Sequence, residues 1–175
     1  MVARHTVGVM GSGTAAHEDH ARPVGELLAE LGVNLLTGGG SGVMRAVSRA
    51  YVQHPQKRGI CIGILPCASE TDRATPKAGY PNEFVELSIY THLPFSGQLG
   101  THDLSRNHIN VLSTSAIVAL PGEHGTASEV ALALRYNKPV IAYARDAELA
   151  SLIPESVRRV DNIRDVELFL REHLD

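Results

Sequence analysis

Three glycine-rich turns are the parts of this sequence best suited to chemistry, because each follows an apolar run and precedes a helical pattern. Glycine lets the backbone turn sharply and come close to a ligand, and the N–H groups at a helix start bind anions. If the apolar runs form parallel strands, the turns share one edge of the sheet, where we expect them to hold a phosphate group together. The turns are Gly11-Ser12-Gly13, Gly38-Gly39-Gly40-Ser41-Gly42 and Pro121-Gly122-Glu123-His124-Gly125-Thr126.

Several polar side chains near these turns have both a ligand-binding and a structural interpretation. The hydroxyls of Ser12 and Ser41 can donate to phosphate or cap their own helices. Glu129 can act on a ligand, but Thr126-Ala-Ser-Glu129 also matches a capping box, in which the glutamate reaches back to the helix start. His124 is either an acid or phosphate donor or an exposed loop histidine. The second turn continues as GGGSGVMR without the lysine of a Walker motif, so we do not expect an ATPase of that type.

Alternating strand and helix patterns must position these turns. Strands buried on both faces that alternate with helices form a parallel sheet with right-handed crossovers. We therefore predict an α/β fold, a Rossmann-like parallel sheet with helices on both faces, in a single domain over residues 1–175. The predicted strands are Thr6–Met10, Val33–Thr37, Gly59–Leu65, Phe84–Ile89, Ala116–Leu120 and Pro139–Tyr143. The predicted helices are Pro23–Leu31, Val43–Gln53, Leu104–Ser113, Thr126–Tyr136 and Asn162–Leu174.

The stretch from Pro66 to Asn82 interrupts this alternation, because it carries three prolines among Ser, Thr, Asp and Gly. A connection of that length is usually functional or mobile. We predict a surface loop after the third strand, which is either a lid over the ligand or a solvated connection.

Composition excludes several classes of protein. The chain has 43% hydrophobic and 20% charged residues, and no apolar run reaches the roughly 18 residues of a membrane span. The formal charge of −3 gives no reason to expect general nucleic-acid binding.

Cys61 and Cys67 lack metal-binding spacing, so we predict buried thiols in a reducing compartment. The absence of a signal peptide predicts a cytoplasmic location. Only His17 and His20 have a chelating spacing, and we expect no metal site.

Four segments together resemble the LOG-like superfamily. They are GVMGSG, LLTGGGSGVMRAV, SRNHINVLS and PGEHGTASEVALALRYNKPVI, spread between about residues 7 and 143. This superfamily includes the cytokinin-nucleotide phosphoribohydrolases, which cleave the N-glycosidic bond of a nucleoside 5'-monophosphate. It also includes the molybdenum-cofactor carrier proteins, which bind a phosphorylated pterin. The resemblance implies the same Rossmann-like fold and an assembly of two or four subunits.

This sequence is similar to the hydrolase branch at that branch's PGGxGTxxE turn and at an arginine on the helix before the turn. The resemblance implies that Arg106 holds the phosphate and Glu129 acts at the sugar, whereas a surface ion pair with Asp103 or Glu129 is the other interpretation of Arg106. The sequence departs at Glu123, where the motif has its second glycine, and at Asn107, where a lysine is frequent. Asn107 binds either the ligand or a neighbouring turn. The implied ligand-binding residues in this region are Arg106, Asn107, Pro121, Gly122, Gly125 and Thr126.

The segments RNxINxLS and GTASEVALAL look closer to the carrier branch. We therefore predict binding of a phosphorylated, nucleotide-like ligand, with no required cofactor and with molybdenum cofactor or a nucleoside monophosphate as the bound molecule. The alternatives are a nucleoside 5'-monophosphate phosphoribohydrolase with Arg106 and Glu129 as catalytic residues, and a nucleotide sensor or oligomeric scaffold. Because Val130–Leu134 is apolar almost all round, we predict that this helix packs on the sheet and on a second subunit, in a homodimer or homotetramer.

Overall fold

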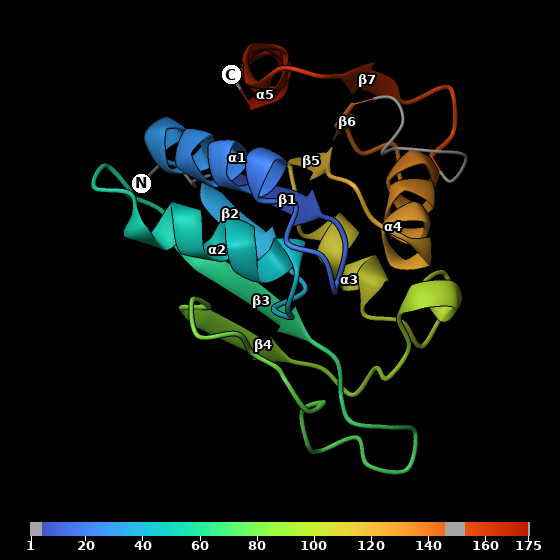
Figure 1. Ribbon diagram of the computed structural model, residues 1–175. Helices are drawn as coiled ribbons and strands as arrows, with labels where there is room; N and C mark the ends of the chain where they lie inside the picture. The colour runs from blue at the N-terminus through green and yellow to red at the C-terminus, as the bar shows by residue number, and fades with distance from the viewer. Residues whose placement is uncertain (1–4, 146–152, 175) are drawn as a thin grey trace.

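Seven parallel strands form one sheet in the order β4-β3-β2-β1-β5-β6-β7 in the computed structural model, which describes residues 5–145 and 153–174 (Figure 1). The chain starts at the central strand β1, builds outward to β4, and then crosses back to place β5 on the other side of β1. The predicted α/β Rossmann-like fold is therefore confirmed. The strands are β1 (Thr6–Met10), β2 (Asn34–Thr37), β3 (Cys61–Leu65), β4 (Leu87–Tyr90), β5 (Ala116–Ala119), β6 (Val140–Tyr143) and β7 (Arg158–Val160).

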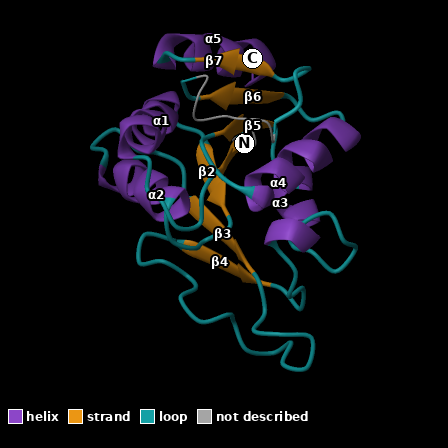
Figure 2. Cartoon of the chain, turned by 45° about the vertical axis from the view of Figure 1, so that its right-hand side comes forward, coloured by secondary structure: helices purple, strands orange, loops and turns teal. Residues whose placement is uncertain are grey.

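The helices lie on both faces of the sheet (Figure 2). One face is covered by α1 (Glu18–Leu31), α2 (Val43–Gln53) and α5 (Ile163–Leu174), whose apolar side chains share one core with the strands. The other face is covered by α3 (Asn107–Leu112) and α4 (His124–Arg135), and a short 3-10 helix, η1 (Gly97–Leu99), precedes α3. Reversal of the winding at β1 brings the turns after β1, β2 and β5 to the same edge of the sheet, as ligand sites in this class of fold require.

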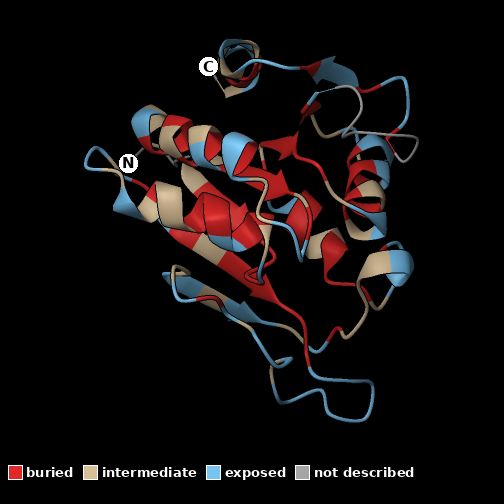
Figure 3. Cartoon of the chain, viewed as in Figure 1, coloured by how far each residue is buried: buried red, intermediate tan, exposed pale blue. Residues whose placement is uncertain are grey.

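Alternation along the central strands separates the two cores. Val7 and Val9 of β1 belong to the core under α1 and α2, whereas Met10 belongs to the core under α3 and α4. Figure 3 shows the central strands buried, while β4 and β7 at the two edges are mostly exposed. The sheet therefore has a fully enclosed centre, and the glycine turns leave from that centre.

Some element boundaries differ from the sequence prediction. Helix α1 begins at Glu18 rather than Pro23, because Pro23 lies inside the helix instead of in its first turn. Helix α3 begins at Asn107 rather than Leu104, since the Ser105 hydroxyl accepts a hydrogen bond from the Asn107 N–H and closes a turn there. Strand β7 was not predicted, because only Val160 of its three residues is buried. An edge strand of that kind carries no apolar pattern.

Helix α4 packs differently from the prediction in one respect. Leu132 is only 1% exposed and lies in the core between α4 and the sheet, so it is covered within the subunit rather than by a second subunit. Ala131, Leu134 and Arg135 form the exposed side of the helix. The apolar composition of α4 therefore reflects burial against the sheet along most of its length.

Candidate functional site

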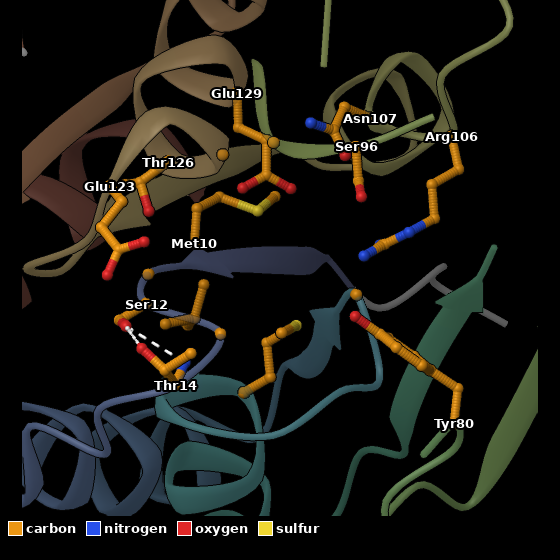
Figure 4. A pocket seen from close by; sticks show the side chains of 17 residues that line it. Met10, Ser12, Thr14, Tyr80, Ser96, Arg106, Asn107, Glu123, Thr126 and Glu129 are labelled. Atoms are coloured by element: carbon orange, nitrogen blue, oxygen red, sulfur yellow. Dashed lines mark hydrogen bonds between the residues drawn. The ribbon is translucent and has the colours of Figure 1, made fainter. Parts of the chain in front are cut away.

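A cavity of about 200 Å³ opens at the edge of the sheet where the glycine turns meet (Figure 4). Residues from the turns after β1, β2 and β5 line it, together with α3, α4 and the loops before them. Among the predicted site residues, the lining includes Gly11, Ser12, Gly13, Gly38, Arg106, Asn107, Gly125, Thr126 and Glu129. The other predicted residues, Gly39, Gly40, Ser41, Gly42, Pro121 and Gly122, do not line it.

The turns after β1 and β5 are bonded to each other. The Ser12 N–H donates to the Pro121 carbonyl at 3.0 Å, and a Cβ at Gly122 would overlap the Thr126 hydroxyl and come within 2.8 Å of the Ser12 nitrogen. The Ser12 hydroxyl accepts hydrogen bonds from the N–H groups of Thr14 and Ala15. The structure therefore shows that Ser12 stabilises its own turn, a role that does not exclude donation to a phosphate from the cavity lining.

The turn after β2 is held mainly by contacts within the protein. Val43 donates its N–H to the Ser12 carbonyl at 2.9 Å, and Gly42 has a φ of 61°, with no room for a Cβ beside that carbonyl. Ser41 is exposed and does not line the cavity. Gly38 is the residue of this turn that faces the cavity, and a Cβ there would overlap the guanidinium of Arg106.

Arg106 is buried, with 4% of its surface exposed, and its guanidinium points into the cavity (Figure 4). Its Nη1 donates to the Ile64 carbonyl at 3.0 Å, and its Cζ lies 5.8 Å from the centre of the Tyr80 ring. The Nε atom has no hydrogen-bond partner among the residues that the structure describes. The interpretation of Arg106 as a surface residue paired with Asp103 or Glu129 is wrong as to the surface, because the side chain is buried beside Gly38 and the Ile64 carbonyl at the ends of β2 and β3.

Glu129 reaches the cavity from α4 and is 8% exposed. Burial raises the pKa of its carboxyl group above the ordinary value, while Arg106 and a hydrogen bond from the Asn110 amide act in the opposite direction. That hydrogen bond joins Asn110 Nδ2 to Glu129 Oε1 at 3.0 Å. The capping-box interpretation of Thr126 and Glu129 is wrong, because α4 begins at His124 and Glu129 therefore lies one full turn into the helix, beyond reach of its start.

The start of α4 forms another wall of the cavity. Glu123 is the N-cap residue, but no side chain caps the helix there. The hydroxyl of Thr126 is buried and has no hydrogen-bond partner within the described part of the chain. Asn107 donates from its side-chain amide to the Ser128 hydroxyl at 3.2 Å, so it also contacts a neighbouring element. His124 is exposed and does not line the cavity.

Sequence reasoning missed several lining residues that lie outside the glycine turns. Tyr80 comes from the end of the predicted loop at residues 66–82, and Asn82 anchors that end by donating from its amide to the Gly40 carbonyl at 2.9 Å. The loop is otherwise largely exposed, so one end contacts the site and the rest is solvated. The position of Tyr80 near the end of a long loop was the only available signal. The other missed residues are Val9, Met10, Thr14, Met44, Ser96 and Gly97, while Glu123 of the third turn also lines the cavity.

The remaining candidate residues lie away from the cavity. Cys61 and Cys67 are buried and unpaired as disulfides, and burial raises the pKa of the Cys61 thiol to about 11. His20 packs edge-on against Tyr143, while His17 precedes α1. Over residues 5–145 and 153–174, no group of three or more His, Cys, Asp or Glu side chains could hold a metal ion. None of the described helices is long and apolar enough to cross a membrane.

Comparisons with known proteins agree with this fold and with the resemblance to the LOG-like superfamily. A solved molybdenum cofactor binding protein from the phototrophic bacterium Rippkaea orientalis is 30% identical, covers 98% of each chain and has a TM-score of 0.74. The molybdenum cofactor carrier protein of Chlamydomonas reinhardtii is also 30% identical, over 98% of this chain and 99% of that chain, with a TM-score of 0.70. An uncharacterized protein of Archaeoglobus fulgidus is 34% identical over 136 residues, 77% of this chain and 76% of that protein.

The resemblance to the LOG-like superfamily and to its molybdenum-cofactor carrier branch is therefore confirmed. The profile of the SLOG cluster4 family matches residues 4–168, which is nearly the whole sequence. The chain belongs to the SLOG cluster4 family.

Proposed function

We propose that this protein binds a phosphorylated, nucleotide-like ligand in the cavity, in the manner of a molybdenum-cofactor carrier. Two solved proteins that are 30% identical over nearly the whole chain bind or carry molybdenum cofactor, and this supports a ligand of that kind. The cavity lies at the point of the sheet where such folds bind phosphorylated molecules. The cofactor or a nucleoside monophosphate is the bound molecule in this proposal, with no step of chemistry required.

The observation that carries the proposal is a pair of buried polar groups that have no hydrogen-bond partner among the described residues. Arg106 Nε and Thr126 Oγ1 have unused donors, and both side chains line the cavity. Leaving such a group unpaired in a folded protein costs about 1 to 3 kcal/mol. Phosphate oxygens would accept from both, and the N–H groups at the start of the twelve-residue helix α4 add further donors. Glycine at position 38 leaves room for the guanidinium, because a Cβ there would overlap it.

Mass spectrometry of the small molecules released from natively purified protein tests the proposal without assuming a reaction. We expect a phosphorylated pterin or nucleotide. Calorimetric titration with that compound should show that Arg106→Ala weakens binding by about 2 to 4 kcal/mol, because a charge-assisted contact is lost. Arg22→Ala, at an exposed arginine of α1, is the matched control and should leave binding unchanged. Release of no phosphorylated compound, together with binding unaffected by Arg106→Ala, would contradict the proposal.

A second candidate, a nucleoside 5'-monophosphate phosphoribohydrolase, is favoured by one feature of Glu129. Its carboxyl group is buried, faces the cavity and lies in the field of Arg106, so it is free to act at a bound sugar instead of capping α4. A carboxylate facing the cationic transition state of glycosidic cleavage would lower the barrier. Chromatography of nucleoside monophosphates incubated with the protein tests this candidate. Base release that Glu129→Gln abolishes would favour the hydrolase over the carrier.

The proposed assembly is a homodimer or homotetramer. Several large apolar side chains remain exposed on or beside the face that α3 and α4 cover only in part. A parallel sheet is normally covered on both faces, and large exposed apolar patches mark interaction sites. The exposed residues are Ile60, Leu87, Ile89, Leu112 and Leu134.

A further inference from the structure

The charged side chains of the cavity do not favour an anion. Of the described residues that line it, Arg106 is the only cation, while Glu123 and Glu129 are both acids. Even with Glu129 protonated, the formal charge of the lining is zero, whereas a phosphate monoester carries about −1.5 to −2 at neutral pH. The charged side chains alone therefore give a phosphorylated ligand no net counter-charge, and the start of α4 is the other positive feature of the lining.

Glu123 is the acid that conflicts most directly with phosphate binding. It is the residue between Gly122 and the start of α4, and Gly122 packs against both the Ser12 nitrogen and the Thr126 hydroxyl. Figure 4 shows its carboxylate beside Thr126 and above Ser12, within the group of hydroxyls and N–H donors that suit a phosphate. Arg106 lies on the far side of the turn after β1, where it is bonded to the Ile64 carbonyl at the end of β3. The guanidinium and the Glu123 carboxylate therefore lie on opposite sides of the cavity (Figure 4).

We propose that the cavity takes its phosphorylated ligand together with a divalent cation of the Mg²⁺ type, and that the Glu123 carboxylate is the protein's ligand to that cation. This inference rests on the proposed phosphate-ligand function. Mg²⁺ is usually bound by one or two carboxylates plus substrate phosphates and water, rather than by a closed set of protein ligands. One carboxylate beside a phosphate site matches that mode, although it falls short of a site that could hold a metal alone.

A second observation at the same place supports a bound ligand. Thr126 is 3% exposed and lines the cavity, and its hydroxyl has no hydrogen-bond partner among the described residues. Ser12 and Thr14 add two hydroxyl oxygens, 3.2 Å apart, across from it. The polar groups of the lining near Glu123 are oxygen and N–H groups, while Met10 and Met44 add two thioethers to the lining. Oxygen donors favour Mg²⁺, Ca²⁺ or Mn²⁺ over softer metals.

Calorimetric titration with inorganic pyrophosphate, in buffer with MgCl₂ and in buffer with EDTA, tests the inference. We expect wild-type protein to bind pyrophosphate about tenfold or more tightly with Mg²⁺ than with EDTA, because the cation removes the repulsion from Glu123. Glu123→Gln should lose that dependence and bind pyrophosphate in EDTA more tightly than the wild type does in EDTA. Glu172→Gln, at an exposed glutamate of α5, is the control and should keep the wild-type dependence.

Electron paramagnetic resonance with Mn²⁺ in place of Mg²⁺ supplies a direct readout. The signal of free Mn²⁺ should fall when wild-type protein is added to Mn²⁺ and pyrophosphate, and it should not fall beyond the protein-free level with Glu123→Gln. Pyrophosphate binding of equal strength in MgCl₂ and EDTA would overturn this inference alone. Binding in neither buffer would overturn it together with the proposed phosphate site. Cation dependence that survives Glu123→Gln would remove Glu123 from the cation site.

Discussion

The two faces of the sheet bury different kinds of side chain. Among the described residues of α1, α2 and α5, the buried side chains are mostly apolar, apart from His20, Ser48 and the hydroxyl of Tyr51, and most of them belong to one apolar core. The other face carries a dense group of buried polar residues. Some lie between the residues just before α3 and the start of β5, and the others lie along α4. They are Ser105, Arg106, Asn107, Asn110, Thr114, Thr126, Ser128 and Glu129.

This difference indicates which face stabilises the fold and which one binds a ligand. On the face under α3 and α4, the atoms without hydrogen-bond partners in the described chain are Arg106 Nε, Asn110 Oδ1 and Thr126 Oγ1. Unsatisfied buried groups lower stability. Proteins keep such groups where function needs them, and the stability is made up elsewhere. Substitutions on the two faces should therefore separate stability from binding.

Removal of a core side chain under α1 should have the largest effect on stability. Leu28 has no exposed surface, so Leu28→Ala should lower the free energy of unfolding by about 3 kcal/mol through lost burial and a new cavity. Urea denaturation measures this change. Leu168→Ala, at a leucine of α5 that is 54% exposed, is the control and should change stability by less than about 0.5 kcal/mol. Similar losses for both variants would contradict the assignment of this face to stability.

Charge on the exposed side of α4 should break the proposed assembly without unfolding the subunit. Leu134 lies on that side, so Leu134→Glu should reduce the molar mass measured by light scattering while the circular dichroism of the fold is kept. Leu132→Glu buries a charge in the core of the same helix and should unfold the protein. A Leu134→Glu variant of unchanged mass would place the interface elsewhere, for example on the exposed side of β4.

The order and type of most elements could be predicted from the sequence, because period, glycine position and length are local signals. The six predicted strands and five predicted helices all exist, with ends shifted by a few residues. The predicted and observed ends differ where a side-chain hydrogen bond sets the end, as the Ser105 hydroxyl does at the start of α3. Strand β7 was missed because an exposed edge strand of three residues needs no apolar pattern.

The site could be predicted only in part, because residue type does not reveal which side of a turn faces the cavity. Gly38 and Gly42 belong to one turn, yet Gly38 lies beside Arg106 whereas Gly42 packs on the Ser12 carbonyl. Tyr80 reaches the cavity from a loop that joins distant strands, which is a tertiary contact without a local signal. The capping-box pattern at Thr126 and Glu129 was misleading, since the helix begins three residues earlier than the pattern requires.

Two buried threonines on the face under α3 and α4 allow a matched test of which residues stabilise the fold and which bind the ligand. Thr126→Val removes a hydroxyl that has no partner in the described chain, so it should raise the free energy of unfolding by about 1 kcal/mol while weakening the binding of the phosphorylated ligand. Thr114→Val removes a hydroxyl that donates to the Val111 carbonyl at 2.8 Å, so it should lower stability by about 1 kcal/mol and leave binding unchanged. Urea denaturation and calorimetric titration measure the two quantities. Equal stability changes in both variants would show that the Thr126 hydroxyl is satisfied in the folded protein.

Replacement of Glu129 should give the smallest change in the free energy of unfolding at any single pH. The sign of this change follows from the direction of the pKa shift of Glu129. Burial raises the pKa of this carboxyl group above 4.5, the ordinary value, so the folded protein holds the proton more tightly than the unfolded chain does. The free energy of unfolding should therefore fall as the pH rises from 4.5 through the raised pKa, and the loss should be complete above it. Glu129→Gln cannot ionise and still accepts the Asn110 hydrogen bond, so its stability should exceed that of the wild type increasingly over this range. Urea denaturation at a series of pH values measures the difference, with the exposed Glu172→Gln as the control. Parallel stability curves for the wild type and Glu129→Gln would mean that Arg106 offsets the effect of burial in full.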